Sequence, residues 1–136
     1  MELRGTHTFA SASPQQVWNA LHNSAAVKNS LPGADSVEWQ GDSAIAVSGG
    51  IGPIKGSGVA QVVEQTPPTH LKLAVNRATV NAAVTVDLAP SGAGTLLSYV
   101  ATAEANGAIG AGLTMAKPLI EGQLNAFFSK LEGQIA

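Results

Sequence analysis

The spacing of apolar residues changes in the last third of this chain of 136 residues, near residue 105. Before that point, apart from two short helical segments, apolar and polar residues alternate in short segments separated by turn residues, which is typical of antiparallel strands. After it, apolar residues recur at steps of three and four, which predicts one long amphipathic helix. These residues are Leu113, Ala116, Ile120, Leu124, Phe127, Phe128, Leu131 and Ile135. A sheet followed by a single long helix allows few folds, because each must bury its apolar face against the other.

The first third of the chain predicts one strand and two short helices. Residues 2–10 alternate as a half-buried strand does. Ser13 can cap a helix that begins with Pro14, a position where proline's missing N–H costs nothing. A second short helix is expected from Asn23-Ser24 to residue 28, and Leu31-Pro32-Gly33 should end it.

Six further strands complete the pattern, and the connections between them are short. They are expected at residues 36–40, 43–49, 59–65, 70–76, 80–88 and 95–104. Short connections favour antiparallel pairing. The order of elements predicts an α+β helix-grip domain over residues 1–136, with a curved sheet of about seven strands around the C-terminal helix. Pro118 should kink that helix or separate a loose first turn. Small inward residues would leave an apolar cavity between helix and sheet.

Composition excludes several classes of protein. Only 12% of residues are charged, 45% are apolar and the net charge is −2. Without a basic cluster, nucleic-acid binding is not expected. The absence of cysteine excludes disulfides and thiolate chemistry. The N-terminus has no hydrophobic signal core and no apolar run is long enough to span a bilayer, so a cytoplasmic protein is expected.

The segment GGIGPIKGS, residues 49–57, superficially resembles a phosphate-binding loop. A P-loop needs Gly directly before its Lys, then Ser or Thr, and a helix afterwards. Here Ile54 precedes Lys55, Gly56 follows it, and the next segment has a strand pattern. The sequence therefore favours a hairpin turn at Gly52-Pro53 over a nucleotide site.

Strand parity and helix period select the residues expected to line a cavity. They are Phe9, Ile45, Val47, Leu71, Leu73, Val84, Tyr99, Ile120, Leu124 and Phe128, with Leu113 and Met115 near its mouth. Leu31-Pro32-Gly33 and a loop at residues 107–113 are the expected gate. His7 shares the inward face and either orients a ligand carbonyl or is hydrogen-bonded within the core. The Tyr99 hydroxyl likewise needs a partner from protein, water or ligand.

The remaining polar residues show no site pattern. His7, His22 and His70 lie in different elements without the spacing of metal ligands, so no metal site is expected. No paired carboxylates and no nucleophile elbow occur, and a solvated face explains the acidic residues, including Glu64 and Asp87. Trp18 and Trp39 are expected to be packing residues.

Several segments, in order across nearly the whole chain, carry a family resemblance. They are SPQQVWNAL (13–21), VKNSLPGADSVE (27–38), GPIKGSG (52–58), TPP (66–68), GTLLSYVATAE (94–104) and LIEGQLNAFFSKL (119–131). With them the chain resembles the START-like (SRPBCC) superfamily and, within it, the CoxG family of carbon monoxide dehydrogenase accessory proteins. Two features depart from that family: the loop after Gly56 is about two residues shorter, and NRATVNAAVTV (76–86) replaces a Gly-rich segment. Both fall at the expected pocket wall or rim, so ligand identity does not carry over.

The resemblance implies an accessory protein without a resident cofactor. It would bind a quinone or lipid-like ligand and help recruit a molybdenum hydroxylase of the carbon monoxide dehydrogenase type to the inner face of the cell membrane. Two alternatives stay open. One is an enzyme of the polyketide cyclase or aromatase type, which needs polar groups in the pocket, here at most His7, Tyr99 and Arg77. The other is an assembly chaperone whose pocket is filled by side chains.

Overall fold

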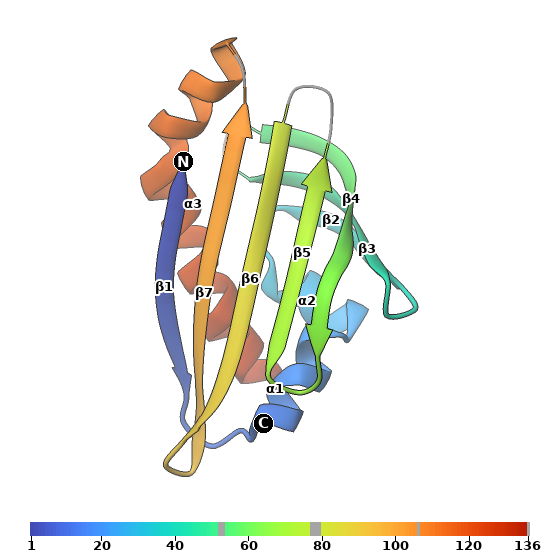
Figure 1. The fold of residues 1–136 in the computed structure, drawn as a ribbon, viewed down its shortest axis with the longest axis vertical. Helices are drawn as coiled ribbons and strands as arrows, with labels where there is room; N and C mark the ends of the chain where they lie inside the picture. Colours follow the sequence, from blue (N-terminus) through green and yellow to red (C-terminus); the bar gives the residue numbers. More distant parts are fainter. Residues whose placement is uncertain (52–53, 77–79, 106, 136) are drawn as a thin grey trace.

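The computed structural model describes residues 1–51, 54–76, 80–105 and 107–135, and it confirms the α+β helix-grip architecture. Its elements are β1 (Glu2–Phe9), α1 (Pro14–Leu21), α2 (Ser24–Ser30), β2 (Ala34–Gln40), β3 (Ala44–Ile51), β4 (Ile54–Thr66), β5 (His70–Asn76), β6 (Val80–Ser91), β7 (Gly94–Ala105) and α3 (Gly107–Ile135). Over the described residues the strands form one seven-stranded antiparallel sheet. The helices lie on one side of this sheet, with α3 running along its length (Figure 1).

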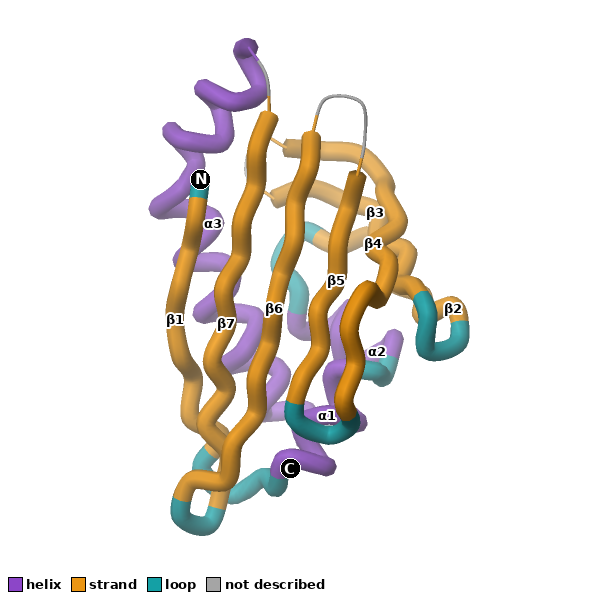
Figure 2. Tube along the Cα trace, viewed as in Figure 1, coloured by secondary structure: helices purple, strands orange, loops and turns teal. Residues whose placement is uncertain are grey.

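The sheet order is β1-β7-β6-β5-β4-β3-β2, so the first strand pairs with the last. All other neighbours are consecutive in the chain, as short hairpin connections require. Register shifts between Ala34 and Ser36 and between Val62 and Glu64 interrupt two ladders. Such bulges bend a sheet and increase its twist. Figure 2 shows β2, β3 and the first half of β4 curling away from the flatter β1-β7-β6-β5 part.

The short helices begin where their capping residues predict. The Ser13 Oγ accepts the Gln16 backbone N–H at 3.2 Å, and the Gln16 side chain accepts the Ser13 N–H at 2.8 Å. This reciprocal pair is a capping box, and Pro14 follows it at the first helical position. The Asn23 side chain caps α2 through the Ala26 N–H. Helix α2 continues to Ser30, two residues beyond its expected end.

The expected gate loop at residues 107–113 is wrong, because these residues form the first turns of α3. Three glycines in GAIGAGL suggested a loop, since each costs about 1 kcal/mol relative to alanine in a helix. A helix that is already nucleated gains one backbone hydrogen bond for every residue added, and that gain offsets the glycines. The helix also continues through Pro118 rather than dividing there.

The hairpin around GGIGPIKGS is longer than expected. Strand β4 begins at Ile54 instead of residue 59, and Ile54 pairs with Ile51 of β3. Gly52 and Pro53, the predicted turn residues, lie outside the described residues. A strand, not a helix, follows the lysine, which confirms that this segment lacks P-loop geometry. The β6–β7 turn is also tighter than expected, because Pro90, Ser91 and Gly94 belong to the strands.

Candidate functional site between the sheet and α3

The inward-facing residues of β5, β6 and β7 form rows that run across the strands, and we call each row a level of the sheet. Leu71, Val86 and Tyr99 lie opposite one another on β5, β6 and β7, and all three are buried. The next inward level along the same strands, Leu73, Val84 and Ala101, is only half-buried. The register places these two levels next to each other, so the change from buried to half-buried side chains occurs within one inward step along the strands. One end of the interior is therefore sealed by a packed core.

Helix α3 shows the same change of burial. Phe128 and Leu131 are buried, at 4% and 0% exposure, whereas Leu124 and Ile120, one and two turns earlier, are half-buried. All four belong to the apolar core cluster between helix and sheet. We define the accessible inner surface as the half-buried set Leu73, Val84, Ala101, Ile120 and Leu124. Toward β1 the helix closes off this surface, because Leu3 and Ala116 are buried.

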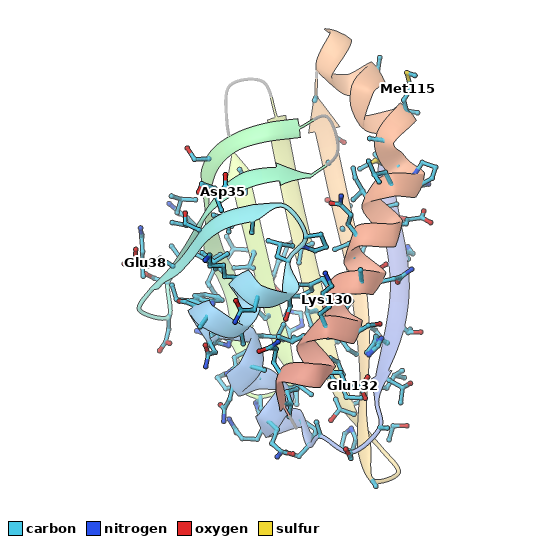
Figure 3. The ribbon with its side chains drawn as sticks, turned by 180° about the vertical axis from the view of Figure 1, so that it is seen from behind. Asp35, Glu38, Met115, Lys130 and Glu132 are labelled. Carbon is cyan, nitrogen blue, oxygen red and sulfur yellow. The ribbon has the colours of Figure 1, made fainter. Side chains whose placement is uncertain are left out.

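The residues predicted to line a cavity are distributed over both levels. Buried in the core are Phe9, Ile45, Leu71, Tyr99 and Phe128; half-buried are His7, Val47, Leu73, Val84, Ile120 and Leu124. Leu113 lies in α3, but its side chain is outside the described part, as is Arg77. Met115 is 84% exposed and points away from the sheet, so it does not face the interior (Figure 3).

The remaining part of the predicted gate connects α2 to β2. Leu31 and Pro32 are half-buried, and Gly33 is exposed with a positive φ of 82°. A Cβ on Gly49 of β3 would lie 2.2 Å from the Gly33 carbonyl oxygen. This segment therefore packs directly on β3.

The Tyr99 side chain lies across β1 at the sealed end of the interior. A Cβ added to Gly5 would lie only 2.6 Å from the Tyr99 hydroxyl, so the phenol ring fits over β1 because residue 5 has no side chain. The ring centroids of Tyr99 and Phe128 are 5.4 Å apart. Burial, with a smaller contribution from the negative charge of Glu121, raises the pKa of Tyr99. The raised pKa keeps the phenol neutral, and within the described part of the chain its hydroxyl has no hydrogen-bond partner.

His7 is held by α3 through Glu132. Its Nε2 donates to Oε1 of Glu132 at 3.0 Å, and Oε2 of the same carboxylate accepts the Ala10 backbone N–H at 2.9 Å. The His7 ring also meets Phe9 edge-on, with centroids 4.8 Å apart. The structure thus supplies a hydrogen bond to His7 from within the protein, which was one of the two interpretations, although the bond is only partly buried. We call this arrangement of Glu132, which is labelled in Figure 3, with His7 and Ala10 the Glu132 clasp.

The Glu132 clasp predicts a loss of stability in acid. The Ala10 N–H, followed by the His7 hydrogen bond, lowers the pKa of Glu132 below its ordinary 4.5. A depressed carboxyl pKa contributes stability above the unfolded value, and that contribution disappears as pH falls through the folded value. Glu132→Gln should therefore cost up to about 1 kcal/mol at pH 6, a small effect because the side chain is partly solvent-screened. The difference from wild type should shrink by pH 3.

Urea unfolding at pH 6, 5, 4 and 3 measures this difference. Glu38→Gln is the matched control, because Glu38 is exposed on β2 and points into solvent (Figure 3). It should change the free energy of unfolding little at any pH. A Glu132→Gln deficit that stays constant from pH 6 to pH 3 would show that the carboxylate charge is not what stabilises the clasp.

Among the described residues, three polar atoms that the sequence did not single out are buried without a hydrogen-bond partner: His22 Nε2, Ser30 Oγ and Gln123 Oε1. The His22 ring is stacked between Trp18 and Trp39, with centroids 4.6 Å away on each side. Its Nδ1 donates to the Trp18 carbonyl oxygen at 2.9 Å, and Nε2 is the ring nitrogen left without a partner. Ser30 lies on α2 and Gln123 on α3.

The opposite face of the sheet carries a polar cluster. His70 Nδ1 lies 2.6 Å from Asp87 Oδ1, and Nε2 lies 3.0 Å from Glu64 Oε1. These two hydrogen bonds, that to Asp87 first, raise the pKa of His70. Both carboxylates are exposed, as the solvated-face interpretation predicts, but the sequence did not reveal that they bracket a histidine. Over the described residues, no three His, Asp or Glu side chains are arranged to hold a metal ion.

Comparison with known proteins identifies the family. The polyketide cyclase / dehydrase and lipid transport family matches residues 2–135, which is nearly the whole chain. The chain belongs to this family. Membership of the polyketide cyclase family agrees with the START-like part of the resemblance seen in the sequence. Among curated proteins, none matches this chain.

Solved structures support the same fold. A conserved protein from Geobacillus kaustophilus is similar at 27% identity, with a TM-score of 0.82 over 99% of this chain and 95% of its own. A protein from Thermus thermophilus gives 17% identity and a TM-score of 0.81, over 99% and 97% of the two chains. A START superfamily protein from Mycobacterium smegmatis gives 15% and 0.79, over 98% and 96%. The last two likenesses concern the fold alone. No helix in the described part of this polyketide cyclase family member is long and apolar enough to cross a membrane.

Proposed function

We propose that this chain is a non-enzymatic binding protein that holds a hydrophobic small molecule against the accessible inner surface. The observation that carries the proposal is the abrupt change of burial between the Leu71 and Leu73 levels of the sheet. Apolar side chains that face inward yet stay accessible are unusual in a close-packed interior. They are what a preformed apolar ligand site requires. The family description, which includes lipid transport, agrees with such a ligand.

Within this proposal, the CoxG resemblance gives the more specific role. A quinone or other lipid-like molecule would occupy the site, and the protein would help bring a molybdenum hydroxylase to the inner face of the cell membrane. The support is the ordered trio LPG (31–33), GPIKG (52–56) and IxGxxxxFF (120–128). Deleting the gene and measuring how hydroxylase activity divides between membrane and soluble fractions tests this role. An unchanged distribution would count against it.

Ligand binding is tested by filling the accessible inner surface. Val84 faces inward on β6, and its neighbour Thr85 faces outward. Val84→Phe should weaken the binding of a menadione probe at least tenfold, whereas Thr85→Phe should leave it unchanged. Native mass spectrometry of protein purified from its own host should also show a co-purifying hydrophobic molecule. Equal binding by both variants, together with no co-purifying molecule, would contradict the proposal.

A second candidate is a polyketide cyclase-type enzyme, and the Glu132 clasp is what favours it. With Nε2 of His7 bonded to Glu132, Nδ1 of a neutral ring is the acceptor and is available as a general base. Tyr99, whose hydroxyl is unpartnered within the described chain, approaches the same Phe128 ring. Turnover of a poly-β-keto thioester that disappears in both His7→Ala and Tyr99→Phe would support the enzyme over the binding protein.

A further inference from the structure

Two of the three buried polar atoms that lack a hydrogen-bond partner in the described chain belong to α2 and α3, which pack against each other. Ser30 is completely buried, and its hydroxyl oxygen has no partner among the described residues. The amide oxygen of Gln123 is buried without such a partner as well, although the rest of that side chain is half-buried. Buried polar groups in native proteins are nearly always hydrogen-bonded, so two orphans at one contact require an explanation. A ligand that supplies the missing hydrogen bonds would explain both unpartnered atoms.

Each orphan lies on the helix face that carries a residue of the apolar cluster between α2 and α3. Val27 of α2 and Phe127 of α3 belong to one apolar cluster with Val37 and Ile45. Ser30 follows Val27 by three residues and Gln123 precedes Phe127 by four, so each orphan shares a helix face with its cluster residue. Helix α2 lies against α3 in this region (Figure 3). Both polar atoms therefore border the same α2–α3 contact, within a turn of the Val27–Phe127 cluster.

The same contact adjoins the proposed ligand site. Gln123 is next to Leu124 of the accessible inner surface, and Ser30 directly precedes Leu31, the first residue of the connection to β2. Leu73 of the accessible inner surface packs against the same cluster as Val27 and Phe127, so a molecule lying along Leu73 would come within a helix turn of Gln123 and Ser30. Tyr99 lies on the opposite wall of the site, which is the sheet. It faces the part of α3 between Glu121 and Phe128.

The chemistry of these groups selects the ligand class. A serine hydroxyl both donates and accepts, and a glutamine amide offers one acceptor and two donors, but neither is charged. The five residues of the accessible inner surface are all apolar, and the nearby carboxylate of the Glu132 clasp is already bonded to His7 and Ala10. A carboxylate or phosphate brought here would lose hydration without gaining a cation, which is unfavourable.

We propose that Ser30 and Gln123 form the polar end of the ligand site and that they select an apolar molecule with a neutral hydrogen-bonding head group over one with a carboxylate. This inference rests on the proposed function, because it assigns part of the same site. The two residues act as specificity residues. Their orphan oxygens are not needed for the fold, since neither oxygen makes a hydrogen bond within the described chain.

Isothermal titration at pH 8 with 1-decanol, decanoate and decane tests this inference. Wild type should bind decanol at least tenfold more tightly than decanoate. Ser30→Ala and Gln123→Leu should each weaken decanol binding by about 2–10-fold, the value of one net hydrogen bond. The double variant should bind decanol no better than decane. The exposed Ser129→Ala and Gln134→Leu on α3 are the matched controls and should bind as wild type does.

Thermal unfolding of the same variants separates a ligand role from a structural one. Because neither orphan oxygen has a hydrogen bond to lose, Ser30→Ala and Gln123→Leu should keep or raise the melting temperature. Lower melting temperatures, unchanged decanol affinity in both variants, or a preference for decanoate would overturn the inference. If decanol binding is lost only in Tyr99→Phe, the head group sits on the opposite wall and the proposed function survives. If wild type binds none of the three probes, the proposed function fails with it.

Discussion

Phe128→Ala is expected to destabilise the protein by about 3–5 kcal/mol, the usual cost of deleting a buried phenyl ring. Phe128 is 4% exposed at the point where α3 meets the sealed end of the sheet. Its ring centroid lies 5.2 Å from that of Phe127 and 5.4 Å from that of Tyr99. Alanine would remove these ring contacts and leave a cavity that the surrounding strands cannot collapse to fill. The free energy of unfolding of a native protein is about 5–15 kcal/mol, so this loss would be a large fraction of the total.

Urea unfolding followed by tryptophan fluorescence measures the effect, because Trp18 belongs to the same core cluster as Phe128. Leu119→Ala on the same helix is the control. Leu119 is 48% exposed, and a surface substitution of this kind should change the free energy of unfolding by no more than about 0.5 kcal/mol. Similar losses in the two variants would show that α3 is not anchored through Phe128.

The architecture was predictable because it depends on the period of apolar residues, which is a local property of the chain. The change of period near residue 105 places the sheet before the helix, and alternation in β1 correctly puts His7 and Phe9 on the inward face. The prediction was wrong at residues 107–113, where glycine content suggested a loop. There, extension of an existing helix outweighed the propensity of single residues.

The polar features of the interior were not predictable, because they depend on residues far apart in sequence. The Glu132 clasp joins His7 to a residue 125 positions away, and no spacing rule connects them. Ser30 and Gln123 have ordinary positions in ordinary helices. Only the placement of α2 against α3 shows that their polar atoms are buried and, within the described chain, unpartnered. Sequence patterns therefore predicted which side of each element faces inward, but not which polar groups would lack partners there.

Gly94→Ala should have an effect as large as Phe128→Ala, although it adds only one methyl group. A Cβ at Gly94 would lie 1.8 Å from the Phe9 carbonyl oxygen and 2.8 Å from the Ala10 carbonyl carbon. These are backbone atoms, so no side-chain rotation relieves the overlap. The segment after β1 is also held in place, because Glu132 accepts the Ala10 N–H and Thr95 Oγ1 donates to the Ala12 carbonyl at 2.7 Å.

We therefore expect Gly94→Ala to cost about 3 kcal/mol or more, the upper end for forcing an atom into a packed site. Gly92→Ala in the same turn is the matched control. Gly92 has a φ of 58° but nothing within 4 Å of its added Cβ, so only the left-handed backbone is penalised, by about 1–2 kcal/mol. Urea midpoints of the two variants separate steric overlap from backbone strain. Equal midpoints would mean that the β1–α1 segment can move away from β7, and that neither the Glu132 clasp nor the Thr95 hydrogen bond fixes it.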